Sequence, residues 1–289
     1  MPKKSNDGRR VTPAQLKRNA ILAGLSDETA AAVIVEGVLL DLPVRQRIYE
    51  VEGPIREVYF PLDAVLSVVS HMQDGSQIEI GTIGREGMSA FPLLMGAAST
   101  ANDCYCQVPG SAIRISDRLF RSLSATDARF RQLLDRYLQA YVNMLGQLAA
   151  CNRLHSVYER CSRWLLMTSD RVNTRKIPLT HEYLAMMLGT SRSGVTIAAG
   201  TLQQAGFIHY SRGVVEIRDP DGLRDAACEC YEVARRQFDG LLRQTNGSDP
   251  AASDGASAPP ARARRAPKPA RRDHQRRGSP RYGNDYAPG

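Results

Sequence analysis

The chain has 289 residues, of which 43% are hydrophobic, and a formal net charge of +8 at pH 7. This hydrophobic share is ordinary for a protein that buries a core, so it excludes a chain that is disordered throughout. No apolar run approaches the roughly 20 residues that cross a bilayer, and the basic N-terminus lacks an apolar signal core. We therefore expect a globular protein of the reducing cytoplasm, with free thiols and no membrane partner.

The positive charge is concentrated at the two ends of the chain. Residues 1–18 and 244–289 each carry a net charge of +5, so the middle of the chain is slightly acidic. Both ends have too little apolar surface to offset the entropy of ordering them, which predicts a disordered basic N-terminus and a disordered Arg/Pro-rich tail. The pattern between them changes twice and predicts a β-rich domain at 19–125, a long helix at 126–155 and a second domain at 156–243.

The β-rich segment is divided into short runs by turn signals such as Pro43 and Pro109-Gly110. Asp74-Gly75 predicts a hairpin, because both residue types tolerate the positive φ of a tight primed turn. Many short strands at close spacing are typical of a sandwich or a roll. The predicted strands are Val38–Leu42, Arg47–Val51, Glu57–Phe60, Val65–His71, Gln77–Ile83, Asp103–Val108 and Ala112–Ile115.

The long helix carries apolar residues in alternating steps of four and three, a repeat of 3.5 residues. We interpret this stripe as a dimer seam; the alternative is an amphipathic helix packed within one subunit. A second stripe, Leu133, Leu138 and Leu145, is then expected to face the β-rich domain. The predicted seam residues are Phe130, Leu134, Tyr137, Tyr141, Met144 and Leu148.

The segment from Arg175 to Arg218 has the features of a helix-turn-helix followed by a wing. Thr180 is a predicted N-cap, Gly189 a helix terminator and Ser191 the cap of a second helix. Arg192 lies in the first turn of that second helix, where a recognition helix meets base edges in the major groove. A hairpin follows, whose tip carries a cation for a DNA phosphate. The predicted DNA-binding residues are Thr180, Ser191, Arg192, Ser193, Thr196 and Arg212.

The run "IPLTHEYLAMMLGTSRSGVTIAAGTLQQAGFIHYSRGVVEI", with "ERCSRWLLM" and "GTIGREGMSA" before it, resembles the CRP/FNR family of bacterial transcription regulators over roughly residues 20–242. The resemblance implies an α+β chain with an N-terminal β-roll (a double-stranded β-helix, jelly-roll-like), a central dimerisation helix and a C-terminal winged helix-turn-helix. It further implies a homodimer on a promoter palindrome of double-stranded DNA, with RNA polymerase as a partner. Ser193 and Ile197 depart from the family's recognition helix, so the base sequence read by well-known members does not transfer.

The family's cyclic-nucleotide site has a Glu that binds the ribose and an Arg that pairs with the phosphate. Glu86 matches the first, but Thr100 occupies the position of the Arg, and residues 88–101 contain no basic side chain. Because the charge-assisted phosphate pair is lost, we expect no binding of cyclic AMP. The effector stays unknown, and its candidate pocket is Glu86, Gly87, Met88 and Thr100. We hypothesise that a signal near Glu86 moves the central helices and the separation of the two recognition helices.

The cysteines predict neither a cofactor nor a metal site. No cysteine precedes Cys104, which excludes the N-terminal iron–sulfur ligands of oxygen-sensing members. Cys104 and Cys106 on one strand are interpreted as small hydrophobic residues. If Cys228 and Cys230 lie on a helix, they point about 200° apart and cannot share one metal ion. Cys151 and His155 have the i, i+4 spacing of a ligand pair, but a packed seam is the favoured interpretation.

Two other classes of function stay open as alternatives. The first is a β-roll effector-binding module that regulates a protein partner without binding DNA, which leaves the basic wing unexplained. The second is an enzyme, but the sequence contains no phosphate-binding loop, nucleophile elbow or His-x-x-x-His pair. We therefore predict a DNA-binding regulator that is not an enzyme.

Overall fold

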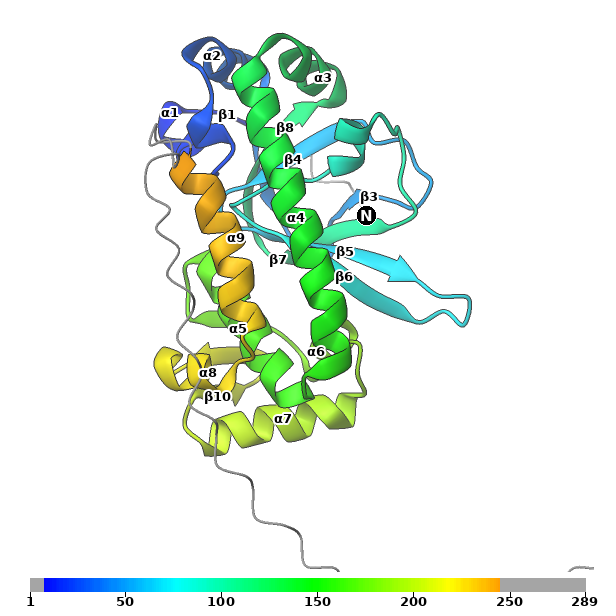
Figure 1. Ribbon diagram of the computed structural model, residues 1–289, viewed down its shortest axis with the longest axis vertical. Helices are drawn as coiled ribbons and strands as arrows, with labels where there is room; N and C mark the ends of the chain where they lie inside the picture. The colour runs from blue at the N-terminus through cyan, green and yellow to red at the C-terminus, as the bar shows by residue number, and fades with distance from the viewer. Residues whose placement is uncertain (1–7, 245–289) are drawn as a thin grey trace, which may run out of the picture. The chain divides into compact units, whose positions relative to one another are not determined.

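The computed structural model describes residues 8–244, with side chains described to residue 240. Its N-terminal half contains two four-stranded antiparallel sheets (Figure 1). One sheet has the order β1-β2-β8-β4, formed by Arg9–Arg10, Val38–Leu42, Gly110–Ser116 and Glu57–Pro61. The other has the order β3-β7-β5-β6, formed by Arg47–Tyr49, Asp103–Val108, Val65–His71 and Gln77–Ile83. Every predicted strand is confirmed to within two residues at each end.

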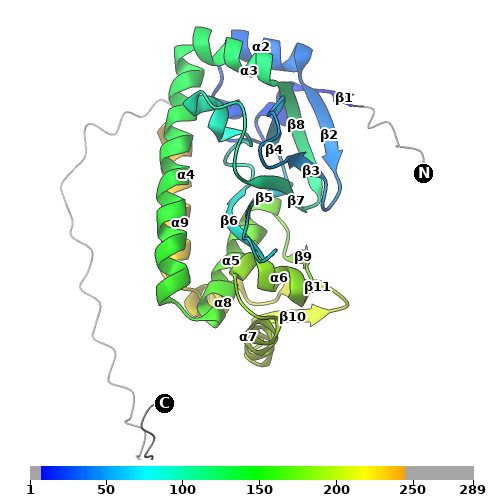
Figure 2. The same cartoon turned by 90° about the vertical axis from the view of Figure 1, so that its right-hand side faces the viewer.

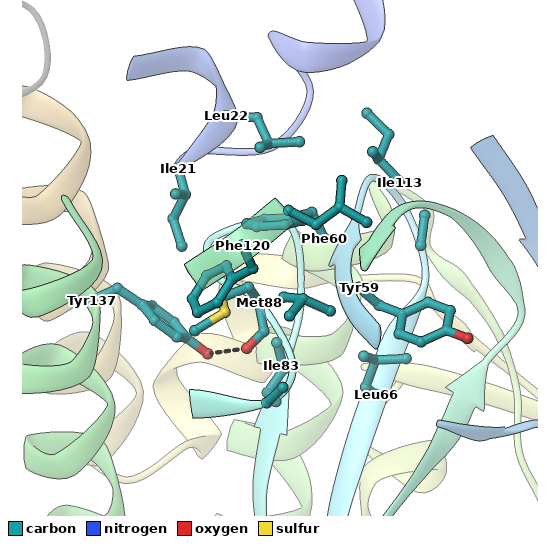
Figure 3. Close-up of a cluster of buried hydrophobic side chains, with 14 of the residues drawn as sticks. Ile21, Leu22, Tyr59, Phe60, Leu66, Ile83, Met88, Ile113, Phe120 and Tyr137 are labelled. Carbon is teal, nitrogen blue, oxygen red and sulfur yellow. Dashed lines mark hydrogen bonds between the residues drawn. The ribbon is translucent and has the colours of Figure 1, made fainter. Parts of the chain in front are cut away.

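The two sheets enclose an apolar core, as the alternation of their strands requires. Phe60, Leu66 and Ile113 are fully buried in this core, and Figure 3 shows them grouped with Ile83 and Met88. Cys104 and Cys106 are also fully buried there, which confirms their interpretation as small hydrophobic residues. The β domain therefore consists of two sheets packed face to face around one apolar core.

The β5–β6 hairpin forms at Asp74-Gly75, but not through a tight primed turn. His71 pairs with Gln77, which leaves a five-residue loop in which only Gly75, at φ +83°, has a positive φ. The Asp74 carboxylate instead accepts a hydrogen bond of 2.9 Å from the backbone N–H of Ser76. The hairpin is confirmed, and the turn type was wrong because Asp74 acts through its side chain.

The prediction of disorder is wrong for residues 8–18. Strand β1 pairs with β2, and the helix α1 (Pro13–Leu16) follows it. Val11 and Leu16 are buried in the β-domain core, so two apolar side chains anchor a segment whose composition is otherwise basic. Residues 1–7 and 245–289 lie outside the described part of the chain.

Short helices complete the N-terminal half. They are η1 (Leu22–Gly24), α2 (Asp27–Glu36), η2 (Phe91–Met95) and α3 (Asp117–Thr126). The long helix α4 then runs from Ala128 to Leu154, which confirms the predicted helix and its length. Asp127 caps it by accepting a hydrogen bond of 2.9 Å from the N–H of Phe130, and Ser26 donates to the same carboxylate at 2.7 Å. The start of α4 is thereby tied to the cap of α2.

The stripe predicted as a dimer seam faces the β domain of the same chain. Phe130, Leu134, Tyr137, Tyr141 and Met144 are all buried in the β-domain core, and Leu148 packs against it half-buried. Tyr137 donates a hydrogen bond of 3.1 Å to the carbonyl of Met88 (Figure 3). The predicted seam is therefore wrong. Repeats of 3.5 and 3.6 residues diverge by only about 20° per heptad, which is too little over this length to separate a seam from a core-facing stripe.

The C-terminal half surrounds a second apolar core. Its elements are α5 (Val157–Val172), β9 (Lys176–Pro178), α6 (His181–Leu188), α7 (Arg192–Gln204), β10 (Ile208–Ser211), β11 (Val214–Ile217), α8 (Pro220–Ala226) and α9 (Cys230–Gln244). The three strands form a small antiparallel sheet in the order β10-β11-β9. The helix α9 returns along α4 (Figures 1 and 2).

Buried and half-buried polar contacts join the β domain to α5. The Glu79 carboxylate on β6 accepts hydrogen bonds from the Trp164 indole at 3.1 Å and from the Ser67 hydroxyl at 2.8 Å. Arg171, near the end of α5, forms an ion pair of 2.8 Å with Glu86. Both members of that pair are over 90% buried. Since a buried charge is costly without its partner, this pair fixes the position of α5 against the β domain.

Glu79 predicts a pH-dependent stability. Burial raises its pKa to about 7, although its hydrogen bonds with Ser67 and Trp164 act in the opposite direction. The folded protein therefore binds the Glu79 proton more tightly than the unfolded chain, in which the pKa is near 4.5. The free energy of unfolding consequently falls as the pH rises from about 4.5 through 7. Glu79→Gln lacks the titrating group, so between pH 5 and 8 the wild type should lose about 2–3 kcal/mol of unfolding free energy relative to the variant.

Urea unfolding at several pH values measures this difference. Glu50→Gln, at an exposed carboxylate, is the control and should follow the wild type at every pH. Parallel stability curves for wild type and Glu79→Gln would show that burial does not shift this carboxylate.

Candidate nucleic-acid interface

The helices α6 and α7 form the predicted helix-turn-helix. The Thr180 hydroxyl caps α6 by accepting a hydrogen bond of 3.2 Å from the N–H of Tyr183. Gly189 ends α6 in the left-handed region at φ +57°, and the Ser191 hydroxyl caps α7 through the N–H of Gly194 at 3.1 Å. The two N-caps and the helix terminator are therefore confirmed. Each could be predicted because Ser and Thr are favoured at N-caps and Gly is favoured at a left-handed helix end.

Small side chains let α7 approach its neighbours closely. Ala198 and Ala199 are buried, and Val195 and Leu202 are fully buried beside them. These four residues form the inner face of α7, which packs against α5 and α6. The opposite face of α7 is consequently left in solvent.

The outer face of α7 begins with Arg192, which is exposed and forms no ion pair among the described residues. The Ser193 hydroxyl lies 2.9 Å from that of Ser191. Thr196 is exposed, but its hydroxyl donates to the carbonyl of Arg192 at 2.9 Å. Among the predicted base-reading side chains of this helix, Arg192 alone has no hydrogen-bond partner within the described residues. Contact of these residues with DNA stays a prediction.

His181 and Tyr210 of this surface were missed from the sequence, and Ile197 was noted only as a departure from the family's recognition helix. Ile197 is 71% exposed on the outer face of α7, next to Thr196. The ring of His181 stacks on that of Tyr210 at 4.4 Å, and its Nδ1 lies 3.0 Å from the Thr196 hydroxyl. Burial lowers the pKa of His181, and the charge of Arg192 lowers it further, so both favour the neutral imidazole. No local sequence signal marks these contacts, because they join α6, α7 and the wing.

The wing is the β10–β11 hairpin, in which Ser211 pairs with Val214. Its two turn residues, Arg212 and Gly213, have φ values of +48° and +75°, as a type I′ turn requires. Gln203 on α7 accepts a hydrogen bond of 2.7 Å from the N–H of Tyr210. The predicted hairpin is confirmed, and this bond fixes the exposed Arg212 relative to the recognition helix.

The four residues of the predicted effector pocket do not line one cavity. Glu86 borders a cavity of about 690 Å³ together with Arg171, but Gly87, Met88 and Thr100 are not among its lining residues. Met88 is fully buried in the core, and the carbonyl of Thr100 accepts a hydrogen bond from the N–H of Glu52 in a separate loop.

Glu86 already has a guanidinium partner, supplied by Arg171. Arg171 donates to the Glu86 carboxylate from Nε at 2.9 Å and from Nη2 at 2.8 Å, and it also contacts the Thr82 hydroxyl. The pocket prediction is therefore corrected. Arg171 lies 85 residues after Glu86 in the sequence, so no local pattern could indicate that the two residues pair.

The geometric argument against a metal site at Cys228 and Cys230 is wrong. Helix α9 begins at Cys230, so Cys228 precedes it and the helical angle of about 200° does not apply. The ligand atoms of both cysteines lie within 4.8 Å of one another and of those of Cys151 and His155. Four potential metal ligands are therefore brought together.

Within residues 8–244 the structure contains no helix that is both long and apolar enough to cross a membrane.

Comparisons with known proteins agree with this geometry. The family model described as the Crp-like helix-turn-helix domain matches residues 159–226. No curated protein sequence matches the chain. A putative CRP/FNR-family transcriptional regulator from Eubacterium rectale is similar in structure, with a TM-score of 0.57 at 15% identity, over 73% of this chain and 98% of that one.

Two further solved structures show the same likeness. The c-di-GMP-responsive global regulator CLP of Xanthomonas campestris has a TM-score of 0.54 at 16% identity, over 66% of this chain and 99% of that one. A CRP-family regulator of Thermus thermophilus, TTHB099, has a TM-score of 0.55 at 18% identity, over 65% of this chain and 95% of that one. The resemblance seen in the sequence is confirmed: this chain has the fold of the CRP/FNR transcription regulators and carries a Crp-like helix-turn-helix domain.

Proposed function

We propose that the protein is a cytoplasmic, homodimeric regulator that binds double-stranded DNA through α7 and contacts RNA polymerase at promoters. The observation that carries the DNA-binding part is Arg192: it is exposed at the first turn of a capped helix and has no acidic partner among the described residues. A guanidinium at this position can donate two parallel hydrogen bonds to one guanine in the major groove. No enzymatic step is part of the proposal.

The wing supports the same orientation on DNA. Arg212 projects from the tip of the β10–β11 hairpin, and Lys176 and Arg175 lie exposed on and beside β9 of the same small sheet. Cations at these positions suit phosphates next to the groove that α7 occupies. Phosphate contacts position the protein, whereas Arg192 supplies the base-specific contact.

The dimer must use a face of α4 other than the buried stripe. Leu138, Val142, Leu145 and Ala149 follow one another in steps of four, three and four on a neighbouring face. Val142 and Ala149 are exposed, Val142 by 52%, and the two leucines are half-buried. We propose that the copies pair along this apolar repeat, called here the outer stripe. A two-fold dimer would place the two copies of α7 about 34 Å apart, one turn of DNA.

The sensor part of the proposal excludes cyclic AMP. A ribose hydroxyl that binds the Glu86 carboxylate has to displace Arg171 from a buried ion pair. Because α5 carries Arg171 and packs against α7, a ligand at Glu86 is energetically linked to the position of the recognition helix. We propose that the unknown effector acts through this ion pair.

Substitution of Arg192 tests base recognition. We expect Arg192→Ala to weaken binding to a duplex selected from a random library by about 1–3 kcal/mol and to leave binding to unrelated duplexes nearly unchanged. Arg212→Ala should weaken both kinds of binding equally and reduce the slope of log K against log salt by about 1. Fluorescence anisotropy at several salt concentrations measures both effects.

Arg121→Ala, at an exposed position on α3, is the matched control and should bind like the wild type. If Arg192→Ala lost affinity for selected and unrelated duplexes alike, Arg192 would not read bases. If the wild type bound no duplex even in dilute buffer, the regulator would act without DNA.

Charge on the outer stripe tests the dimer. Val142→Glu should convert the dimer to a monomer in sedimentation velocity, because two symmetry-related carboxylates would meet at the seam. Gln132→Glu, on an exposed face of α4 away from the stripe, should stay dimeric. A dimeric Val142→Glu, or a monomeric wild type, would contradict the seam.

Calorimetry with cyclic AMP tests the sensor. We expect no saturable heat at millimolar nucleotide and no rise in melting temperature, with a cyclic-AMP-binding protein as the positive control. A saturable signal that disappears in Arg171→Met would overturn the proposed exclusion and identify Arg171 as a ligand of the nucleotide.

A further inference from the structure

Four side chains with metal-binding atoms converge where the end of α4 meets the start of α9. Cys151 and His155 share one face at the end of α4, Cys230 is the first residue of α9, and Cys228 lies two residues before it. The Cys151 and Cys228 sulfurs are 3.5 Å apart, and the Cys230 sulfur is 3.6 Å from the His155 Nδ1. All four ligand atoms lie within 4.8 Å of one another.

These separations suit one tetrahedral ion. Bonds of about 2.3 Å to sulfur and about 2.0–2.1 Å to nitrogen place tetrahedral ligand atoms roughly 3.5–3.8 Å apart. An iron–sulfur cluster needs wider spacing, because its ligands are divided between two iron atoms in a [2Fe–2S] cluster and among four in a [4Fe–4S] cluster. A disulfide needs sulfurs about 2.05 Å apart, much closer than Cys151 and Cys228. The geometry therefore favours a mononuclear site.

The surroundings of the four ligands are also those of a metal site. The Nε2 of His155 lies 3.3 Å from the Glu229 carboxylate, which leaves Nδ1 directed at the thiols. A carboxylate on the far nitrogen orients a metal-bound imidazole and increases its basicity. Gln147 on α4 donates a hydrogen bond of 3.1 Å to the Cys230 sulfur, as amide donors do to metal thiolates.

The charge balance needs a cation, and two are present. Three thiolates and one histidine around a divalent ion carry a net charge of −1. Arg160 and Arg163 on α5 are buried, and both interact electrostatically with the thiols. The Nε atom of each is buried without a hydrogen-bond partner in the described structure. Buried charges require compensation, so the negative charge of the metal-thiolate centre and the positive charges of the two guanidinium groups stabilise each other.

We propose that Cys151, His155, Cys228 and Cys230 bind one Zn²⁺ ion that clamps α9 to the end of α4. Binding replaces the three thiol protons with bonds to the ion and changes no oxidation state. Three of the four ligands are buried and no open position is left, which is the arrangement of a structural zinc site and not of a catalytic one.

The clamp adjoins the DNA-binding unit. Arg160, one of the compensating cations, donates a hydrogen bond of 2.9 Å to the carbonyl of Leu188, the last residue of α6. It also donates to the Asn152 side chain on α4 at 3.1 Å. The site therefore contacts the first helix of the helix-turn-helix through one side chain.

Metal analysis of the full chain tests the site. Protein purified from zinc-supplemented cells under reducing conditions should contain about one Zn²⁺ per chain by mass spectrometry. After exchange, Co²⁺ should give the intense visible bands of a tetrahedral site and a thiolate charge-transfer band. Cys228→Ser and His155→Ala should lose the metal, whereas Cys106→Ala, a buried thiol elsewhere in the chain, should retain it.

Hydrogen exchange gives a second readout that needs no variant. Removal of the metal should accelerate amide exchange in residues 228–240 by at least about tenfold and leave α2 unchanged. Zinc well below one per chain with no tetrahedral Co²⁺ spectrum would overturn the proposal. So would iron with inorganic sulfide, or a Cys151–Cys228 disulfide in freshly reduced protein. Retention of zinc by Cys228→Ser would remove that residue from the site.

Discussion

The packing of α4 against the β domain of its own chain is the constraint that positions α9 and the four-ligand cluster at the end of α4. Tyr137, in the first half of this helix, reaches the backbone at Gly87, where a Cβ atom would come within 2.1 Å of its ring. The absence of a side chain at Gly87 thus permits the helix to approach the β domain closely, and the Tyr137 hydroxyl then satisfies the carbonyl of Met88. Because α4 is held along its length, its far end presents Cys151 and His155 at one fixed place.

The β domain meets the DNA-binding unit at two places: β6 contacts α6 directly, and buried or half-buried carboxylates hold α5. Glu79 and Glu86 both accept hydrogen bonds from α5 side chains; Glu86 is buried and Glu79 is half-buried. Protonation changes the Glu79 contact, and a ligand that takes the place of Arg171 changes the Glu86 ion pair. The second contact is therefore suited to a ligand signal.

Local signals in the sequence were sufficient for the strands and for the helix-turn-helix. Thr180, Gly189 and Ser191 each occupy a backbone position that selects their residue type, so they could be located without tertiary information. The direction in which the α4 stripe faces was not predictable, since a core-facing and a partner-facing stripe have nearly the same period.

Partners distant in sequence were equally inaccessible. Arg171 meets Glu86 only after the chain has folded, and nothing near either residue indicates the other. The four-ligand cluster was missed because the angle of about 200° between Cys228 and Cys230 assumes that both residues lie on one helix. The helix α9 begins only at Cys230. In each case the missing information was the relative position of two elements, not the nature of either one.

The helix α9 contacts both of the helices that determine the geometry of the molecule. Gln237 accepts a hydrogen bond of 3.2 Å from Asn143 on α4, and the Tyr231 hydroxyl donates one of 2.8 Å to Asp170 on α5. Because α9 contacts α4 from Cys230 and Gln237 and contacts α5 from Tyr231, it restricts the angle between α4 and α5. Because α5 packs against α7, the α9 attachment is one of the contacts that limit how freely α7 can move relative to α4. A stable attachment there favours a pre-organised recognition helix, which lowers the entropic cost of binding DNA.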